Sequence, residues 1–304
     1  MDYQPVLDRI HAALQPVIGQ GKVASYIPEL ANVAADQFGM AVVDVAGNAY
    51  AVGDAGKRFS IQSISKLFAL TLAFQREGDS LWTRVGREPS GNPFNSLVQL
   101  ERENGIPRNP FINAGALVIT DMLASRSVNA AQSLVDFVRK LAGVADITYN
   151  TRVAQSEIST SSRNAAMAHF MKSFGNLHNK VGEVLHAYCH HCAIEMSCVE
   201  LARAVGFLAN HGVNPWNGET VVDPSSAKRL SALMLTCGTY DAAGDFAYRV
   251  GLPAKSGVGG GIVAILPGEC GICVWSPALE ESGNSHAGSL ALEMFTSLTR
   301  RSIF

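Results

Sequence analysis

The chain has 304 residues, and its 24 Lys and Arg residues nearly balance 26 Asp and Glu residues, giving a net charge of -2. Hydrophobic residues make up 47% and charged residues 16%, where a typical soluble domain is roughly 25% charged. The near-neutral balance, without a basic run, argues against nucleic acid as a partner. No stretch approaches the roughly 18 uninterrupted apolar residues of a membrane span. The low charge predicts a large core and a buried interface, and hence a homo-oligomer.

The first 60 residues combine one helix with a strand hairpin. An acidic residue follows Met1 directly, and an amphipathic pattern then predicts a helix rather than a signal peptide, so we expect a cytoplasmic protein. Its apolar positions have helical spacing: Val6, Leu7, Ile10 and Leu14. Short β-type runs at 40–45 and 49–52 flank Gly47-Asn48, a hairpin signal. Six cysteines in so long a chain indicate free thiols in a reducing compartment.

Residues 61–245 are mostly helical in pattern, and most of the segments end at a glycine. The predicted helices are 63–78, 114–126, 130–143, 162–175, 181–192, 197–212 and 225–238. The pattern returns to β-type in 246–254, 255–268 and 270–277, before a last amphipathic helix in 289–302.

Because β-type runs bracket the helical middle, the sheet must be assembled from both chain ends. We therefore predict an α+β fold, with an antiparallel sheet flanked by helices and a helical subdomain. The chain is expected to be a single domain, 1–304, with an α/β part from 1–60 and 246–304 and a helical part from 61–245. Strict βαβ alternation is missing, which disfavours a doubly wound fold.

Two C-x-x-C pairs invite a metal site and are interpreted as core residues instead. Cys270 and Cys273 lie in a strand-like run, where side chains three apart point to opposite faces. Cys189 and Cys192 share a helix face, but no second pair stands at zinc-finger spacing. We expect no metal and no organic cofactor.

The chemistry begins at Ser63 and Lys66, an S-x-x-K at the start of an apolar helix. Residues i and i+3 share a helix face, so the amine is within reach of the hydroxyl. Serine needs an adjacent base, and lysine is a base only when burial or a second cation lowers its pKa. By itself the motif is also what a capping serine and an exposed lysine look like. The chain contains no H-E-x-x-H, G-x-S-x-G or phosphate-binding loop.

The second element is Lys255-Ser256-Gly257, about 190 residues later. An S-x-x-K helix paired with a K-[ST]-G strand is the arrangement of penicillin-recognising serine enzymes. Lys255 would add positive potential near Ser63 and help keep Lys66 neutral. The backbone N–H groups of Ser63 and Val258 would form an oxyanion hole. The middle motif of those enzymes and a secretion signal are both missing, so a β-lactamase or transpeptidase is a poor fit.

Longer blocks carry a more specific resemblance. The chain closely resembles the serine-dependent, β-lactamase-like glutaminases of bacteria, a family that includes the kidney-type and liver-type enzymes of animals. The resembling blocks are 21–31, 58–66, 92–101, 105–118, 156–166, 192–202 and 237–261. The resemblance implies a serine β-lactamase/DD-peptidase-like fold and hydrolysis of L-glutamine to L-glutamate and ammonia. It also implies homo-oligomers, as dimers or tetramers.

The resemblance further implies the site. Ser63 is the nucleophile, Lys66 its base and Tyr240 a proton shuttle near Ser63, with Lys255 and Ser256 in support. The glutamine-binding positions are Tyr26, Gln62, Ser63, Asn113, Glu157, Asn164, Tyr188, Tyr240 and Val258. Glu157 suits the ammonium of glutamine, and the amide and phenol groups suit its carboxylate without a buried cation.

The residues alone leave open a purely structural role for single positions and two functions other than glutamine hydrolysis. Without the resemblance, Glu157 is an ordinary surface charge, Tyr188 a core residue and Asn164 a helix cap. A second function is another serine amidohydrolase of the penicillin-recognising fold, acting on β-lactams, D-amino acid peptides or asparagine. A third is a non-enzymatic scaffold, against which the intact S-x-x-K and K-S-G argue.

Overall fold

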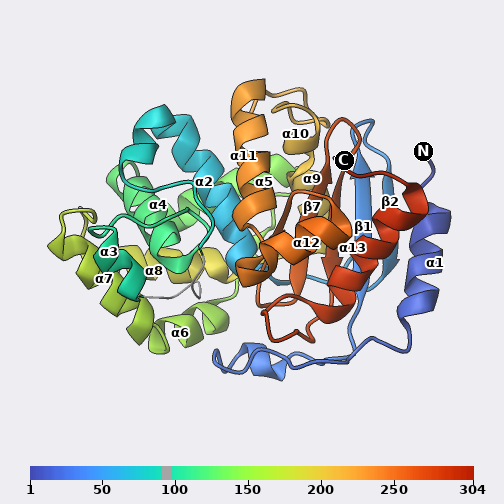
Figure 1. The fold of residues 1–304 in the computed structure, drawn as a ribbon, viewed down its shortest axis with the longest axis horizontal. Coiled ribbons are helices and arrows are strands. Elements are labelled where there is room, and N and C mark those ends of the chain that lie inside the picture. The colour runs from blue at the N-terminus through green and yellow to red at the C-terminus, as the bar shows by residue number, and fades with distance from the viewer. Residues whose placement is uncertain (91–96) are drawn as a thin grey trace.

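The computed structural model describes residues 1–90 and 97–304. Residues 92–96 of the resembling block 92–101 lie outside the described residues. Helices gather on one side of the molecule and a sheet lies on the other, with both chain termini on the sheet side (Figure 1). Within the described ranges, no helix is both long enough and apolar enough to cross a membrane.

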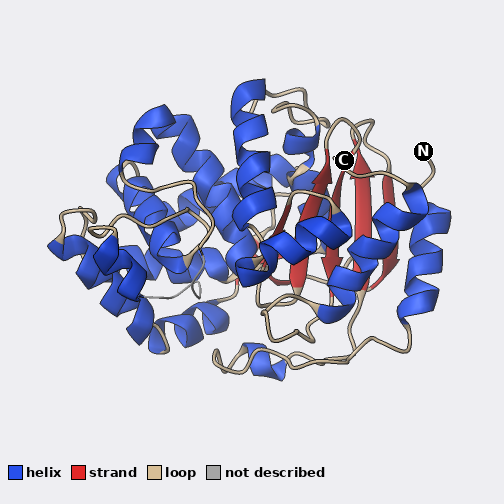
Figure 2. Cartoon of the chain, viewed as in Figure 1, coloured by secondary structure: helices blue, strands red, loops and turns tan. Residues whose placement is uncertain are grey.

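The main sheet is antiparallel throughout and has the order β2-β1-β8-β7-β6 (Figure 2). Its strands are β1 (Gly39–Asp44), β2 (Ala49–Gly53), β6 (Ala254–Ser256), β7 (Gly261–Leu266) and β8 (Cys270–Trp275). Strand β1 from one chain end pairs with β8 from the other, Val42 opposite Ile272. The prediction of an antiparallel sheet built from both ends is confirmed. The predicted hairpin joins β1 and β2, and Gly47 there has a φ of +91°.

Side chains alternate between two cores, one on each face of this sheet. On β8, Ile272 and Val274 face a core shared with three helices, α1 (Gln4–Leu14), α12 (Ala243–Val250) and α13 (His286–Thr299). Cys273 and Trp275 face the larger core, which continues into the helical part. Because side chains alternate between the two faces, β7 and β8 lie between two layers of helix. Every residue of these two strands is buried.

Most helices of the helical part lie in the predicted segments, but α3 and α6 do not correspond to any predicted helix. Its helices include α2 (Ser65–Glu77), α3 (Leu97–Arg102), α4 (Asn113–Ser125), α5 (Ala130–Ala142), α6 (Thr151–Ser159), α7 (Ser162–Ser173), α8 (Val181–Cys192) and α11 (Pro224–Cys237). The segment predicted as one helix over 197–212 is two, α9 (Cys198–Ala204) and α10 (Gly206–Ala209). A small sheet of order β3-β5-β4 also lies here, from β3 (Phe59–Ser60), β4 (Thr148–Tyr149) and β5 (Ile194–Met196).

The β-type interpretation of 246–254 is wrong for most of that segment. Residues Ala243–Val250 form α12, and only Ala254 belongs to a strand. Phe246 and Val250 are four residues apart and bury the same helix face, a helical rather than a strand period. Gly251 ends the helix in the left-handed conformation, with φ +66°.

The cysteines behave as the sequence predicts. Cys270 and Cys273 enter different cores, and all six thiols are free and buried. Cys189 and Cys192 are packed into the larger core. In the part of the chain that the structure describes, no group of three or more His, Cys, Asp or Glu residues is arranged to hold a metal ion.

Candidate active site

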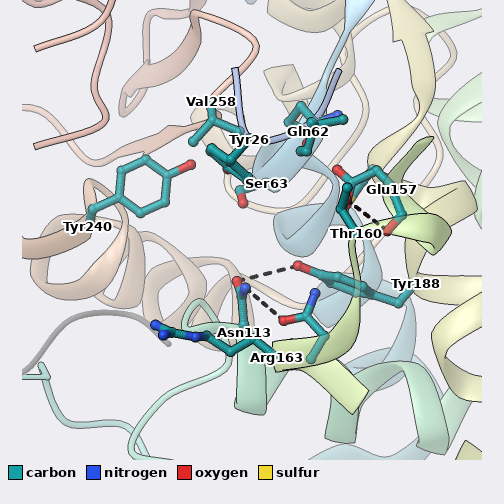
Figure 3. Close-up of a pocket in the computed structure, with 13 residues that line it drawn as sticks. Tyr26, Gln62, Ser63, Asn113, Glu157, Thr160, Arg163, Tyr188, Tyr240 and Val258 are labelled. Atoms are coloured by element: carbon teal, nitrogen blue, oxygen red, sulfur yellow. Dashed lines mark hydrogen bonds between the residues drawn. The ribbon is translucent and has the colours of Figure 1, made fainter. Parts of the chain in front are cut away.

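A cavity of about 380 Å³ lies where the helical part meets the end of the main sheet. It brings together nine residues that the sequence assigns to substrate binding: Tyr26, Gln62, Ser63, Asn113, Glu157, Asn164, Tyr188, Tyr240 and Val258. These come from segments far apart in the chain. In Figure 3, Ser63 lies between Tyr240 on one side and Glu157 on the other, with Val258 and Tyr26 close by. Lys66, Lys255 and Ser256 are buried behind the lining.

Ser63 sits in a tight turn that joins strand β3 to helix α2. The turn is the 3-10 element η2 (Gln62–Ile64), and Gln62 has a φ of +47°, a strained value for a residue with a side chain. Apolar Ile61 and Ile64, both fully buried, fix the turn to the core. Ser63 itself is 8% exposed and faces the cavity. The local fold thus presents one hydroxyl at the helix entrance.

Glycines allow the end of strand β6 to approach this turn. A Cβ on Gly257 would lie 2.6 Å from the Ile61 carbonyl oxygen and 3.3 Å from the Ser63 nitrogen. A Cβ on Gly259 would lie 2.4 Å from the Ser60 carbonyl oxygen. Glycine at 257 and 259 therefore permits a backbone approach that a side chain would block. The approach brings the backbone of 257–258 next to that of Ser63, as a two-amide oxyanion hole requires.

Lys66 is a buried amine whose pKa is close to neutrality. Its Nζ donates to the carbonyl oxygen of Phe111 at 3.2 Å and to Oδ1 of Asn113 at 2.6 Å. Burial lowers the pKa of Lys66 to about 8, opposed by the nearby Cys192 and Glu157. A substantial neutral fraction therefore exists at neutral pH. Among the described contacts, the amine is held by Phe111 and Asn113 rather than by Ser63, whose side chain interacts with Tyr240.

Tyr240 lies on the other side of Ser63 and is also strained, with φ +53°. Its hydroxyl points toward Ser63 (Figure 3). Burial raises the pKa of Tyr240 despite the opposing effects of the Ser63 hydroxyl and the Val258 backbone. The phenol therefore keeps its proton at neutral pH, so it is suited to donate a proton and not to act as the base.

Lys255 holds backbone in place behind Tyr240. Its Nζ donates to the carbonyl oxygens of Gly238 at 2.9 Å and Ser256 at 2.6 Å and lies 4.8 Å from the centre of the Tyr240 ring. Burial, and then the charge of Lys66, lower the pKa of Lys255 well below its ordinary value. Burial is the largest cause of the lowered pKa of Lys66 as well, and the role of Lys255 in keeping Lys66 neutral stays a prediction. Ser256 is fully buried on β6.

Glu157, on α6, is the acidic residue of the lining and is 7% exposed. Burial raises its pKa to about 7, opposed by a hydrogen bond from Gln62 and by the charge of Lys66. Gln62 also donates to the Ser60 hydroxyl at 2.9 Å, which fixes its side chain. Hydrogen bonding and the charge of Lys66 do not fully offset the burial of this carboxylate, so a cation beside it would be favoured.

Amides and a phenol make the wall opposite Val258. Asn113, the first residue of α4, donates from Nδ2 to Oδ1 of Asn164 at 3.1 Å. Its Oδ1 accepts from the Tyr188 hydroxyl at 3.4 Å as well as from Lys66. Tyr188 is buried on α8, and Tyr26 stands at the mouth with 58% of its surface exposed. The wall offers hydrogen-bond donors and acceptors linked directly to the amine of Lys66.

The cavity also contains four residues that the sequence analysis did not select: Ile27, Thr160, Arg163 and Cys192. Thr160 and Arg163 lie in the block 156–166, between the selected residues Glu157 and Asn164. Their closeness in sequence to these two residues was the signal that could have identified them. Cys192 was interpreted as a core cysteine, and it is both buried and in contact with the cavity.

Comparison with known proteins gives one consistent family. The family model described as glutaminase matches residues 21–304. A protein of Ralstonia nicotianae named glutaminase is 68% identical over 304 residues, covering all of both chains. Among solved structures, a probable glutaminase, ybaS, has a TM-score of 0.94 at 35% identity, covering 100% of this chain and 99% of that one. A probable glutaminase from Bacillus subtilis, complexed with 6-diazo-5-oxo-L-norleucine, has a TM-score of 0.89 at 34% identity, covering 100% and 98%.

Proposed function

Because the chain belongs to the glutaminase family and hydrolyses L-glutamine to L-glutamate and ammonia, we propose that it works through a seryl acyl-enzyme formed on Ser63. One observation carries this proposal above the others. Ser63 faces a cavity that is also lined by the protonated phenol of Tyr240. The amine of Lys66 is buried behind this lining and has a pKa of about 8. That combination is what a serine nucleophile needs at neutral pH.

The proposed reaction has two halves. The Ser63 oxygen attacks the side-chain carbonyl carbon of glutamine, its proton passes to Lys66, and the backbone N–H groups of Ser63 and Val258 receive the oxyanion. The tetrahedral intermediate then breaks its carbon–nitrogen bond. The leaving nitrogen gains, through Tyr240, the proton that Lys66 took from Ser63, so ammonia leaves and Lys66 is neutral again. Water next attacks the glutamyl ester, Lys66 accepts its proton, and Ser63 recovers its own as glutamate leaves.

The two pKa directions decide which group is the base. A phenol whose pKa burial has raised is almost wholly protonated at neutral pH, whereas the pKa of Lys66 at about 8 leaves roughly a tenth of the amine neutral at pH 7. Lys66 is therefore assigned as the base and Tyr240 as the proton relay. Asn113 supports this assignment because it orients the Lys66 amine at 2.6 Å.

We assign the substrate groups by charge. The ammonium of glutamine is placed against Glu157 and its carboxylate toward Asn113, Asn164 and the Tyr26 and Tyr188 hydroxyls. The ligand of the Bacillus subtilis relative is an L-amino acid with a carbonyl on its fifth carbon, where glutamine also has one. A ligand of that kind in a structural neighbour supports an amino-acid subsite here.

Three further proposals concern the setting. The six free, buried thiols support a reducing, cytoplasmic location. The family match over 21–304, with a sheet built from both chain ends, supports a single catalytic domain. The low fraction of charged residues, 16%, supports a homo-oligomer, dimer or tetramer, which light scattering would test.

Ammonia release from L-glutamine, L-asparagine and D-glutamine by wild type and Ser63→Ala tests the mechanism. We expect turnover of L-glutamine to fall by roughly 10⁴-fold or more in Ser63→Ala, because nucleophile and base act as a unit. Ser65→Ala is the matched control, since Ser65 is a buried hydroxyl two residues away and outside the cavity lining. Near-normal turnover by Ser63→Ala, with no glutamyl adduct on rapidly quenched wild type, would exclude the acyl-enzyme.

A further inference from the structure

We propose that Arg163 is a specificity-determining residue that binds the α-carboxylate of glutamine at the mouth of the cavity. This inference rests on the proposed function and deepens it. Arg163 is the second residue of α7 and directly precedes Asn164. Its exposed side chain runs along the edge of the cavity, below Asn113 and on the side of Tyr240 (Figure 3). Arg163 therefore lines the same cavity as the amides of Asn113 and Asn164 that are assigned to the carboxylate.

The charges of the lining support this placement. Among the described residues that line the cavity, Glu157 is the one carboxylate and Arg163 the one Lys or Arg side chain. Glutamine enters as a zwitterion, with one ammonium and one carboxylate. Since Glu157 suits the ammonium, Arg163 completes a lining with one opposite charge for each charge of the substrate. Lys66 is poorly placed for the carboxylate, because it lies behind the lining and its amine donates to the Phe111 carbonyl oxygen and to Asn113 Oδ1.

Arg163 has no acidic partner among the described residues, which leaves its guanidinium open to a ligand. Arg152, one helix earlier, is different, because it pairs with Glu29 at 3.1 Å. A guanidinium presents a planar fork that matches a carboxylate with two parallel hydrogen bonds, and an amide offers no charge. A guanidinium at the rim with no acidic partner in the described ranges is suited to the carboxylate of an incoming amino acid.

Helix stability does not account for an arginine at this position. The first turn of an α-helix carries the positive end of the helix dipole, so a cation there is unfavourable. The positive end of the α7 dipole instead favours a bound carboxylate. The first turn of α7 contains no acidic residue that would already neutralise this partial charge. Arg163 and the helix end therefore act on an anion in the same direction. Its solvent exposure limits the effect, because water screens the charge.

The test compares L-glutamine with L-glutamine α-amide, in which the carboxylate is replaced by a neutral carboxamide. For Arg163→Gln we expect kcat/KM for L-glutamine to fall about 10-fold, mainly through KM, as loss of one exposed charge-assisted contact predicts. Turnover of the α-amide should change less than about 2-fold. The L-glutamine effect should shrink as salt is raised, because screening removes what the mutation removes. Arg163→Lys should lie between the two, since it keeps the charge and loses the fork.

Arg76→Gln is the matched control, because Arg76 is exposed at the far end of α2, away from the cavity. It should leave both substrates unchanged. Equal losses for L-glutamine and its α-amide, or no loss for either, would overturn the role of Arg163. Those outcomes are distinct from failure of the proposed function, which depends on Ser63→Ala and on the glutamyl adduct. An active wild type with an inactive Ser63→Ala and an unaffected Arg163→Gln would remove this inference alone.

Discussion

The two ends of the cavity are built in different ways. The reaction end, residues 61–66 and 255–258, is almost entirely buried and has strained or side-chain-free backbone at Gln62 and Gly257. The recognition end, Glu157, Arg163 and Asn164, sits on helices α6 and α7 and reaches from the buried Glu157 to the exposed Arg163. We propose that the reaction end uses burial to set the pKa of Lys66 and that the recognition end uses the charges of Glu157 and Arg163 to select a ligand.

This difference predicts different responses to mutation. At the reaction end, distances are fixed by backbone packed against backbone, so a small change has a large effect on rate. At the recognition end, single contacts are replaceable in part by water, so losses are moderate and appear mainly in KM. A moderate loss seen only in KM at the reaction end, or a large loss in kcat at the recognition end, would show that the two ends do not act separately.

Replacing the base should give the largest effect at the reaction end after loss of the nucleophile. Lys66→Met fills the same buried space without an amine, and we expect kcat to fall by roughly 10³-fold or more. The melting temperature, compared with wild type, checks that the variant folds, since it leaves two oxygens without their Lys66 donor. Activity within about 10-fold of wild type would show that Lys66 is not the base.

Gly257→Ala should give the next largest effect, through backbone displacement alone. The new Cβ would stand 2.6 Å from the Ile61 carbonyl oxygen, closer than real Cβ contacts, so the strand end or the Ser63 turn must move. A displacement near 1 Å at reacting groups costs roughly 100-fold in rate, and we expect that loss in kcat. Gly182→Ala on α8 is the control, because its Cβ would meet nothing within 4 Å. Normal kcat in Gly257→Ala would show that the close approach does not matter for the reaction.

The sequence was informative at the reaction end because the spacing of its residues is local. Ser63 and Lys66 are three residues apart, and the structure buries both at the start of α2, where Ser63 lies in the preceding 3-10 turn. The glycines at 257 and 259 can likewise be identified directly in the sequence. The sequence could not show that Lys66 is held by Asn113, or that burial lowers the pKa of Lys66, because both depend on a helix 47 residues away.

The recognition end was predictable only through the family resemblance. Glu157 and Asn164 are common surface residues by type, and nothing local separates them from Arg163, which was not selected. The segment 246–254 shows the same limit in the fold. Its β-branched and aromatic letters favour a strand, but Phe246 and Val250 pack one face against α13 and the sheet, and tertiary packing makes the segment a helix. Long-range contacts decided each of these cases.

Glu157→Gln should lower kcat/KM for L-glutamine less than the substitution of Lys66 does, and it should also change the pH dependence of kcat/KM. Loss of a charged hydrogen bond to the ammonium costs about 1.5–3 kcal/mol, which is roughly 10- to 150-fold in kcat/KM. The amide keeps the size of the side chain and its contact with Gln62, so folding should be little affected. D-glutamine and L-asparagine serve as controls, because they should remain poor substrates for both proteins.

The sign of the pH effect follows from the two pKa values. Glu157 must be ionised to bind the ammonium, and its pKa in the free enzyme is about 7, whereas Lys66 must be neutral and its pKa is about 8. Activity is therefore lost as pH falls through both values. For wild type, kcat/KM should fall about 10-fold per pH unit between 8 and 7, and more steeply, approaching 100-fold per unit, below 7. Glu157→Gln cannot lose a carboxylate, so its profile should keep the slope of one proton throughout. A variant profile as steep as that of wild type would show that another group, and not Glu157, pairs with the ammonium.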